Sequence, residues 1–276
     1  YEIKKELSSF NKDFIFYMPS QSLTINTLIR ILMLYIIGGR EKIILFLVQY
    51  NDPSRLVLFL AKRLLSVNNL SIITSSQNFM SRFELSKESF VPLGVDTDKF
   101  CSVDTDRKRI LRSKYSLDVS KPMFLHVGHF TKDRGISDLL QIKLNFPDSQ
   151  VICIFSDFKE IPQGSIVSLE KQGIIIIHEY IEKIQEYYQM ADFYIFPVRS
   201  ELSSIGFPLS VIEALSCGIP TFSYKNVTLL KSNLEGITFY TDRSQLIEKI
   251  RNYNKDVKPN YNFSWSQVAE NILEVI

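Results

Sequence analysis

The stretch that decides the fold is MFLHVGHFTKDRG, which occupies residues 123–135. Its apolar start predicts a strand that ends at Gly128, and a polar loop then leads to Arg134 and to a helix whose apolar face begins at Ile136. A glycine at the carboxyl end of a strand lets a ligand approach the backbone, and a cation beside a helix N-terminus favours an anion such as a diphosphate. The same residues also fit an ordinary turn with a solvated basic helix start, so both interpretations stay open at this point.

Apolar strands and helical patterns alternate in the same way along the whole chain. Short apolar runs rich in β-branched residues predict strands at residues 14–17, 42–49, 71–74, 90–93, 123–127, 150–155, 173–178, 193–197, 219–223 and 237–240. Continuous apolar strands that alternate with helices predict a parallel sheet covered on both faces. The fold class is therefore α/β.

The composition changes between residues 95 and 122, where charged residues crowd the segment VDTDKFCSVDTDRKR. We place a domain boundary in this region, at about residue 100. The part before the boundary has few predicted strands for a doubly wound domain and looks incomplete, whereas the part after it has enough.

The overall composition fits a globular protein of one large or two ordinary domains, because the 276 residues are 45% apolar and 22% charged. The 32 Lys and Arg residues nearly balance the 30 Asp and Glu residues, which excludes a dedicated nucleic-acid-binding protein. Cys101, Cys153 and Cys217 form no C-x-x-C pair, which argues against a disulfide framework or a zinc site and for the reducing cytoplasm. No stretch reaches the roughly 18 apolar residues of a membrane span.

A second informative stretch covers residues 191–220, ADFYIFPVRSELSSIGFPLSVIEALSCGIP. Pro208 at the start of a helix leaves the amides of Leu209 and Ser210 available to an anion. One turn later, the carboxylate of Glu213 can accept two hydrogen bonds from vicinal hydroxyls such as those of a ribose. Most glutamates on helices are solvated, but this helix is apolar around Glu213, and a buried carboxylate without a partner is costly.

Five segments, taken together, resemble the retaining glycosyltransferases of the GT-B fold, family-4 type, also called glycosyl transferases group 1. They are VPLGVDTDKF at residues 91–100, LHVGHFTKDRG at 125–135, YQMADFYIFP at 188–197, GFPLSVIEALSCGIP at 206–220 and FSWSQVAENIL at 263–273. The resemblance covers nearly the whole chain from about residue 70.

The resemblance implies a GT-B-like α/β fold with two Rossmann-like domains, each built on a parallel sheet. Residues 1–100 would form part of the acceptor-side domain, 101–262 the nucleotide-sugar-binding domain, and 263–276 a helix that crosses back to the first domain. Such enzymes open with a strand and a glycine-rich loop, and we find no counterpart before Asp13, so the first domain is expected to be incomplete.

The family's functional residues map onto named positions of this sequence. The resemblance implies that Gly128 lets its loop approach the donor diphosphate and that Arg134 stabilises the departing diphosphate. It assigns the ribose to Glu213 and the distal phosphate to the amides of Leu209 and Ser210. The backbone near Tyr180 and Ile181 would face the base, and Arg199 and Gly206 complete the expected donor-binding set.

Two positions depart from the family's pattern. His129 replaces the usual arginine, so the charge there depends on pH and on the ligand. Ile205 stands where the family has the first glutamate of its pair, and Glu201 could substitute for that glutamate if the loop bulges. The expected catalytic residues are therefore Arg134, Glu201 and His129.

The sequence thus predicts retaining transfer of a sugar from a nucleoside diphosphate sugar, a UDP- or GDP-sugar, to a hydroxyl of a glycan, lipid or polysaccharide precursor. No cofactor beyond this donor and no metal is expected, because the aspartate pairs at 96/98 and 104/106 belong to the hinge motif and to a helix cap. The alternatives are an inactive glycosyltransferase-like binding partner and a nucleotide-sugar epimerase. Lys62 and Arg63, on an apolar helix, suggest peripheral contact with the inner face of the membrane, although a solvated helix edge explains them equally well.

Overall fold

The computed structural model describes residues 14–20, 22–37, 42–65, 70–131, 134–156, 160–200, 207–225, 229–230, 234–254 and 259–275. These residues divide into two compact units. The first unit contains the described residues up to Leu93, together with Phe207 and residues from Ser266 onward. The second contains the described residues from Gly94 to Ser200 and from Pro208 to Trp265.

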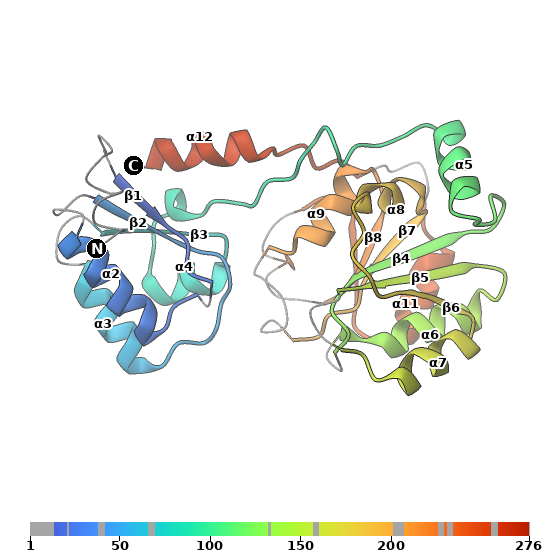
Figure 1. The fold of residues 1–276 in the computed structure, drawn as a ribbon, viewed down its shortest axis with the longest axis horizontal. Helices are drawn as coiled ribbons and strands as arrows, with labels where there is room; N and C mark the ends of the chain where they lie inside the picture. Colours follow the sequence, from blue (N-terminus) through green and yellow to red (C-terminus); the bar gives the residue numbers. More distant parts are fainter. Residues whose placement is uncertain are drawn as a thin grey trace. The chain divides into compact units, whose positions relative to one another are not determined.

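The first unit is built on a small parallel sheet. Its strands, β1 (Phe14–Tyr17), β2 (Lys42–Leu47) and β3 (Leu70–Thr74), are paired in the order β1-β2-β3. The connecting helices α2 (Ile25–Ile37) and α3 (Arg55–Leu65) lie on one side of this sheet (Figure 1). This placement follows because two successive right-handed crossovers in the same direction put both helices on the same face.

After β3, the chain continues through α4 (Gln77–Phe83) and a short 3-10 helix, Lys87–Ser89. The strand predicted at residues 90–93 does not form. Only Phe90 makes a bridge, to Thr74, although Val91 and Leu93 are buried as an apolar strand would be. Pro92 has no backbone N–H to donate to a ladder, which explains why pairing stops there.

The second unit contains a larger sheet of parallel strands. In chain order the strands are β4 (Met123–Gly128), β5 (Gln150–Phe155), β6 (Ile174–Ile177), β7 (Phe193–Phe196), β8 (Thr221–Tyr224) and β9 (Ile237–Tyr240). They are paired in the order β6-β5-β4-β7-β8-β9. With β4 counted as the first strand, this is the order 3-2-1-4-5-6 of a classical Rossmann fold, and the strand order reverses between β4 and β7.

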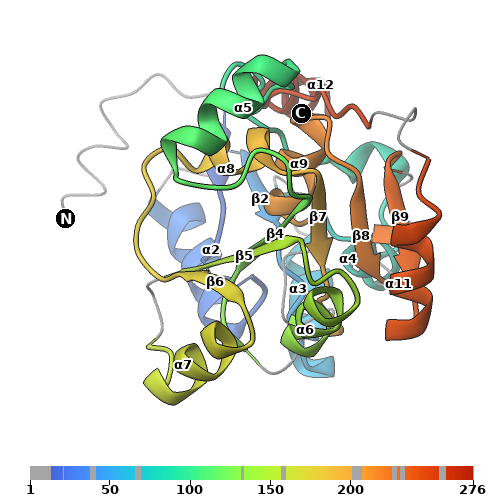
Figure 2. The ribbon, with the colours of Figure 1, turned by 90° about the vertical axis from the view of Figure 1, so that its right-hand side faces the viewer.

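Helices cover both faces of this sheet (Figure 2). One face carries α6 (Ile136–Asn145), α7 (Gln163–Lys171) and α11 (Arg243–Arg251), and the other carries α5 (Thr105–Lys114), α8 (Ile184–Met190) and α9 (Leu209–Ser216). The core between α6, α7, α11 and the strands is aromatic and aliphatic, with Phe124, Leu139 and Phe155 almost fully buried. As the sequence predicts, Asp104 caps α5, because its carboxylate accepts a 2.7 Å hydrogen bond from the amide of Arg107.

The two chain segments at the ends of the second unit are paired with each other. The amide of Val95 donates to the carbonyl of Phe263 at 3.0 Å, and Val95 also bridges Ser264. A Cβ atom on Gly94 would lie 2.7 Å from the backbone nitrogen of Trp265, so this close approach requires glycine. The last helix, α12 (Trp265–Val275), starts at this pairing.

None of the helices in the described part of the chain is long and apolar enough to cross a bilayer. No cluster of three or more His, Cys, Asp and Glu side chains in metal-binding geometry occurs among the described residues.

Candidate functional site

The candidate site lies at the carboxyl edge of the second unit's sheet, where β4 and β7 end side by side. Ligands of open α/β sheets bind at this edge, in the crevice where the strand order reverses. Gly135, which precedes α6, adopts φ +55°, and a Cβ atom there would lie 2.4 Å from the carbonyl oxygen of Pro197, just after β7. Glycine at this position therefore lets the start of α6 pack directly on the end of β7.

Arg134 is the buried cation of the site. Only 8% of its surface is exposed, and a Cβ atom on Gly128 would lie 2.7 Å from its Nη1 atom. Burial lowers the pKa of the Arg134 guanidinium, but arginine stays charged at any physiological pH. A fixed positive charge in so dry a position interacts strongly with an anion bound beside it.

His126 lies next to this cation, within β4. Its Nδ1 atom donates a 2.9 Å hydrogen bond to the carbonyl of Ile195 in β7. Its Nε2 atom lies 3.3 Å from the position that a Cβ atom on Gly128 would take, and it has no hydrogen-bond partner among the described residues. Burial, together with the charge of Arg134, lowers the pKa of His126 to about 4, so the ring is neutral and Nε2 is an acceptor.

The phenol of Tyr194, in β7, connects the predicted residues of separate segments. Its hydroxyl donates a 3.1 Å hydrogen bond to the carbonyl of Val127 in β4. Burial raises the pKa of Tyr194; the nearby Ser210 and Arg134 act to lower this pKa, whereas Glu213 acts to raise it. The structure therefore brings the end of β4, Arg134 and the first turns of α9 to one place.

Glu213 sits one turn into α9 and is partly buried. Burial raises the pKa of its carboxyl, while the nearby Tyr188 and Lys99 lower it without reversing the shift. The helix starts after Pro208, whose side chain makes no capping hydrogen bond. The Pro208 side chain therefore does not occupy the amides of Leu209 and Ser210 in the first turn.

Arg199 lies in a network of ion pairs and hydrogen bonds. Its Nη2 atom binds both carboxylate oxygens of Asp138, at 2.8 and 2.9 Å, and its guanidinium lies 4.4 Å from the centre of the Tyr224 ring. Asp138 is fully buried in α6 and also accepts hydrogen bonds from Tyr240 at 2.9 Å and from Arg243 at 3.2 Å. Among the described residues, the contacts of Arg199 thus run to this network and not to the Tyr194 group.

The remaining predicted residues are distributed along the same edge or fall outside the description. His129 is exposed just after β4, and Tyr180, which is 80% exposed, and Ile181 follow β6. Glu201 and Gly206 lie outside the described residues, as does Ile205.

Sequence reasoning did not single out Tyr194 or Asp138. Tyr194 lies inside a continuous apolar strand, where nothing in the pattern separates it from its core neighbours. Asp138 gave one usable signal, because it is an acidic residue inside a helix whose neighbours Ile136 and Leu139 face the core.

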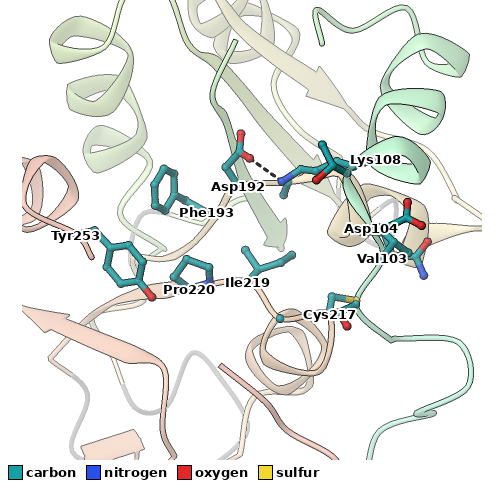
Figure 3. Close-up of a pocket in the computed structure, with 14 residues that line it drawn as sticks. Val103, Asp104, Lys108, Asp192, Phe193, Cys217, Ile219, Pro220 and Tyr253 are labelled. Carbon is teal, nitrogen blue, oxygen red and sulfur yellow. Dashed lines mark hydrogen bonds and ion pairs between the residues drawn. The ribbon is translucent and has the colours of Figure 1, made fainter. Parts of the chain in front are cut away.

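A separate cavity of about 240 Å³ lies at the opposite, amino edge of the sheet (Figure 3). Figure 3 shows apolar side chains, among them Phe193 and Tyr253, on one side and a polar group around Lys108 on the other. Lys108 donates a 2.6 Å hydrogen bond to Asp192, which closes the polar side with an ion pair. This cavity is remote from Gly128, because it adjoins the residues that start β7 and β8.

The second unit is thus a Rossmann-like domain with a buried cation, Arg134, near the point where the strand order reverses. The sequence profile of glycosyl transferases group 1 matches residues 107–263, more than half of the chain. The chain belongs to this glycosyltransferase family.

Two curated relatives are also similar in sequence. The α-galactosylglucosyldiacylglycerol synthase of Streptococcus pneumoniae is 24% identical over 208 residues, which cover 68% of this chain and 53% of the relative. The TuaC protein of Bacillus subtilis, a teichuronic acid biosynthesis glycosyltransferase by its assigned name, is 26% identical over 133 residues, covering 48% of this chain and 32% of the relative. The chain thus spans about half or less of these relatives.

Solved structures show the fold. Anabaena HepE, crystallised with UDP and glucose, has a TM-score of 0.73 at 16% identity over 99% of this chain and 79% of its own. Sucrose-phosphate synthase from Thermosynechococcus elongatus has a TM-score of 0.66 at 16% identity over 90% of this chain and 66% of its own. The fold is GT-B, with parallel sheets in both units, and the small sheet of the first unit is consistent with an incomplete domain.

Proposed function

We propose that this chain binds a nucleoside diphosphate sugar and transfers its sugar, with retention of configuration, to an acceptor hydroxyl. The observation that carries the proposal is the buried guanidinium of Arg134 against Gly128, beside Tyr194 and the first turns of α9 that hold Ser210 and Glu213.

Each group has a specific task in this proposal. The donor diphosphate lies against Gly128, where the missing side chain leaves room, and Arg134 and the first amides of α9 stabilise the charge of the departing diphosphate. The Glu213 carboxylate accepts hydrogen bonds from the ribose hydroxyls. The bond from the anomeric carbon to the diphosphate breaks as the acceptor oxygen bonds the same face, and the acceptor proton passes to the departing diphosphate.

The positive charge needed for this step comes from Arg134 and the helix amides, so the proposal includes no metal and no further cofactor. His129, exposed after β4, can add charge when it is protonated. For the nucleobase of the donor we propose uracil. HepE was crystallised with UDP, which favours a UDP-sugar over a GDP-sugar as the donor here.

The acceptor is proposed from the relatives' names. By their names, one relative is a synthase of a glycosyl diacylglycerol and the other belongs to teichuronic acid biosynthesis. We therefore propose that the acceptor is lipid-linked or a polysaccharide and that the transferred sugar is a hexose.

The test is calorimetric titration of the protein with UDP, GDP, ADP and dTDP. Glu213→Ala should weaken the binding of the preferred nucleotide at least about tenfold. The substitution removes the hydrogen bonds that the ribose hydroxyls donate to the Glu213 carboxylate, and hydrogen bonds to a charged group contribute roughly 1.5 kcal/mol or more. The matched control is Glu170→Ala, an exposed glutamate near the end of α7, which leads into the amino end of β6 and away from the site.

Binding of one nucleotide that Glu213→Ala loses and Glu170→Ala keeps would support the donor site. If no nucleotide binds to the folded protein, or if both variants bind equally well, the proposal fails. Binding without turnover of any offered donor sugar would instead indicate the inactive binding partner.

A further inference from the structure

The outer side of α2 is apolar and exposed. The side of this helix that faces the sheet buries Thr27, Leu28 and Ile31. On its outer side, large apolar side chains recur at spacings of three and four residues, with exposed fractions between 44% and 77%: Ile25, Ile29, Leu32, Met33 and Ile36. This spacing places them in one stripe along the helix.

The neighbouring helix, α3, repeats the arrangement. It buries Val57 and Ala61 and exposes Leu56, Phe59 and Leu60 by 58%, 63% and 39%. The two helices contact each other on the same side of the sheet (Figure 1). Their outer sides, here called the α2–α3 face, therefore form one apolar surface with many large side chains, unlike the scattered exposed apolar residues of an ordinary surface.

The charges on these two helices are all of one sign. The segments INTLIRILMLYII and RLVLFLAKRLL contain Arg30, Arg55, Lys62 and Arg63 and no Asp or Glu. All four basic residues are exposed, and Lys62 forms a 3.4 Å ion pair with Glu84, an exposed residue at the end of α4.

We propose that the α2–α3 face docks on an anionic lipid surface. Apolar side chains enter the boundary between headgroups and acyl chains, while long basic side chains lie along that surface and contact lipid phosphates. A second copy of the chain fits less well, because a twofold interface through this face would bring arginines against arginines. The proposal concerns a surface of the first unit and does not depend on the nucleotide site.

The test is co-sedimentation of the 276-residue chain with vesicles of pure phosphatidylcholine and with vesicles that contain phosphatidylglycerol. We expect at least about tenfold stronger partitioning to the anionic vesicles, and weaker partitioning as salt rises. The double variant Ile29→Ser with Met33→Ser should reduce partitioning about tenfold, and so should Arg55→Gln with Lys62→Gln.

The matched controls change similar residues of the second unit. Leu144→Ser replaces an apolar side chain that is 66% exposed in α6, and Lys171→Gln replaces an exposed cation at the end of α7. Both controls should bind vesicles like the parent protein, and far-ultraviolet circular dichroism shows that every variant is folded.

Two results would overturn the proposal. One is vesicle binding that does not depend on anionic lipid or that the face variants retain. The other is a doubled mass in analytical ultracentrifugation that the Ile29→Ser, Met33→Ser variant returns to the monomer, which would make the face a contact between copies. Nucleotide binding is measured independently by calorimetry. A negative result with vesicles would therefore not contradict the proposed donor site.

Discussion

Acid should destabilise the second unit through one buried histidine. His126 has a pKa of about 4 in the folded protein, against an ordinary value of 6.5, because burial and the nearby Arg134 disfavour its charged form. Between these values the unfolded chain binds a proton that the folded chain rejects. The stability contributed by neutral His126 is therefore complete above pH 6.5 and is lost as the pH falls toward 4.

The size of the effect follows from the two pKa values. At about 1.36 kcal/mol for each tenfold change in proton affinity, the full loss is about 3 kcal/mol, and about 2 kcal/mol of it is lost by about pH 5. A domain is stable by only about 5–15 kcal/mol, so the loss is measurable.

The assay is urea unfolding, followed by circular dichroism at a series of pH values from about 7.5 to about 5. His126→Gln keeps an N–H that can donate to the Ile195 carbonyl but removes the titrating ring, so its free energy of unfolding should change less with pH. Because other groups titrate equally in both proteins, the difference between parent and variant isolates His126. The matched control, His178→Gln, makes the same substitution elsewhere in the second unit and leaves His126 in place, so it should still show the loss that His126 contributes.

A constant difference between the parent protein and His126→Gln across this pH range would refute the reasoning. It would mean that His126 accepts a proton in the folded state as readily as in the unfolded state, and so that the ring is not held neutral beside the cation.

Three further changes have defined outcomes. Asp138→Asn should cost about 2–4 kcal/mol in urea unfolding, because it removes a buried carboxylate that two arginines share, and an unchanged value would contradict the structural importance of this network. Gly135→Ala should destabilise the protein by about 2 kcal/mol or more and weaken nucleotide binding, because the left-handed backbone and the carbonyl of Pro197 both oppose a Cβ atom; Gly164→Ala, with no atom within 4 Å, is the control and should not destabilise. Burial alone would raise the pKa of Asp192, but its cationic and amide partners hold it below the ordinary value of 3.8, so this carboxylate contributes stability that is present above about pH 4 and lost below it, and acid titration of Asp192→Asn should lack that part of the loss.

The sequence was sufficient for the fold because hydrophobic pattern is a local signal that the sheet preserves. The apolar runs that end at Gly128 and at Phe196 became neighbouring strands, and their order made the reversal point. The strand prediction at residues 90–93 was wrong. The apolar side chains of Val91 and Leu93 are buried as expected, but Pro92 prevents the backbone pairing that defines a strand. The hydrophobic pattern predicts which side chains are buried, but it does not predict which backbone amides form hydrogen bonds.

The site was only partly predictable for a related reason. Gly128, Arg134 and Glu213 are residue types that are unusual at their positions in a strand and in two helix starts. The structure places them near the Tyr194 hydroxyl. Their binding of a donor stays a prediction. The ion pair of Arg199 with Asp138 was not predicted, because Asp138 lies on a different element, 61 residues away in sequence. An acidic residue among core-facing neighbours indicates that a partner is needed, but neither local segment identifies a partner at such a separation.

The pairing of Val95 with Phe263 and Ser264 has a consequence for how such proteins diversify. The second unit begins and ends at residues that are neighbours in space, so in genetic terms it is a cassette whose two ends already lie side by side. Recombination at residues 94 and 265 could replace the whole cassette by one of different ligand preference, with no change in the distance between the flanking ends. The condition for such an exchange is a residue without a side chain at position 94, because any Cβ atom there would force the two strands of the junction apart.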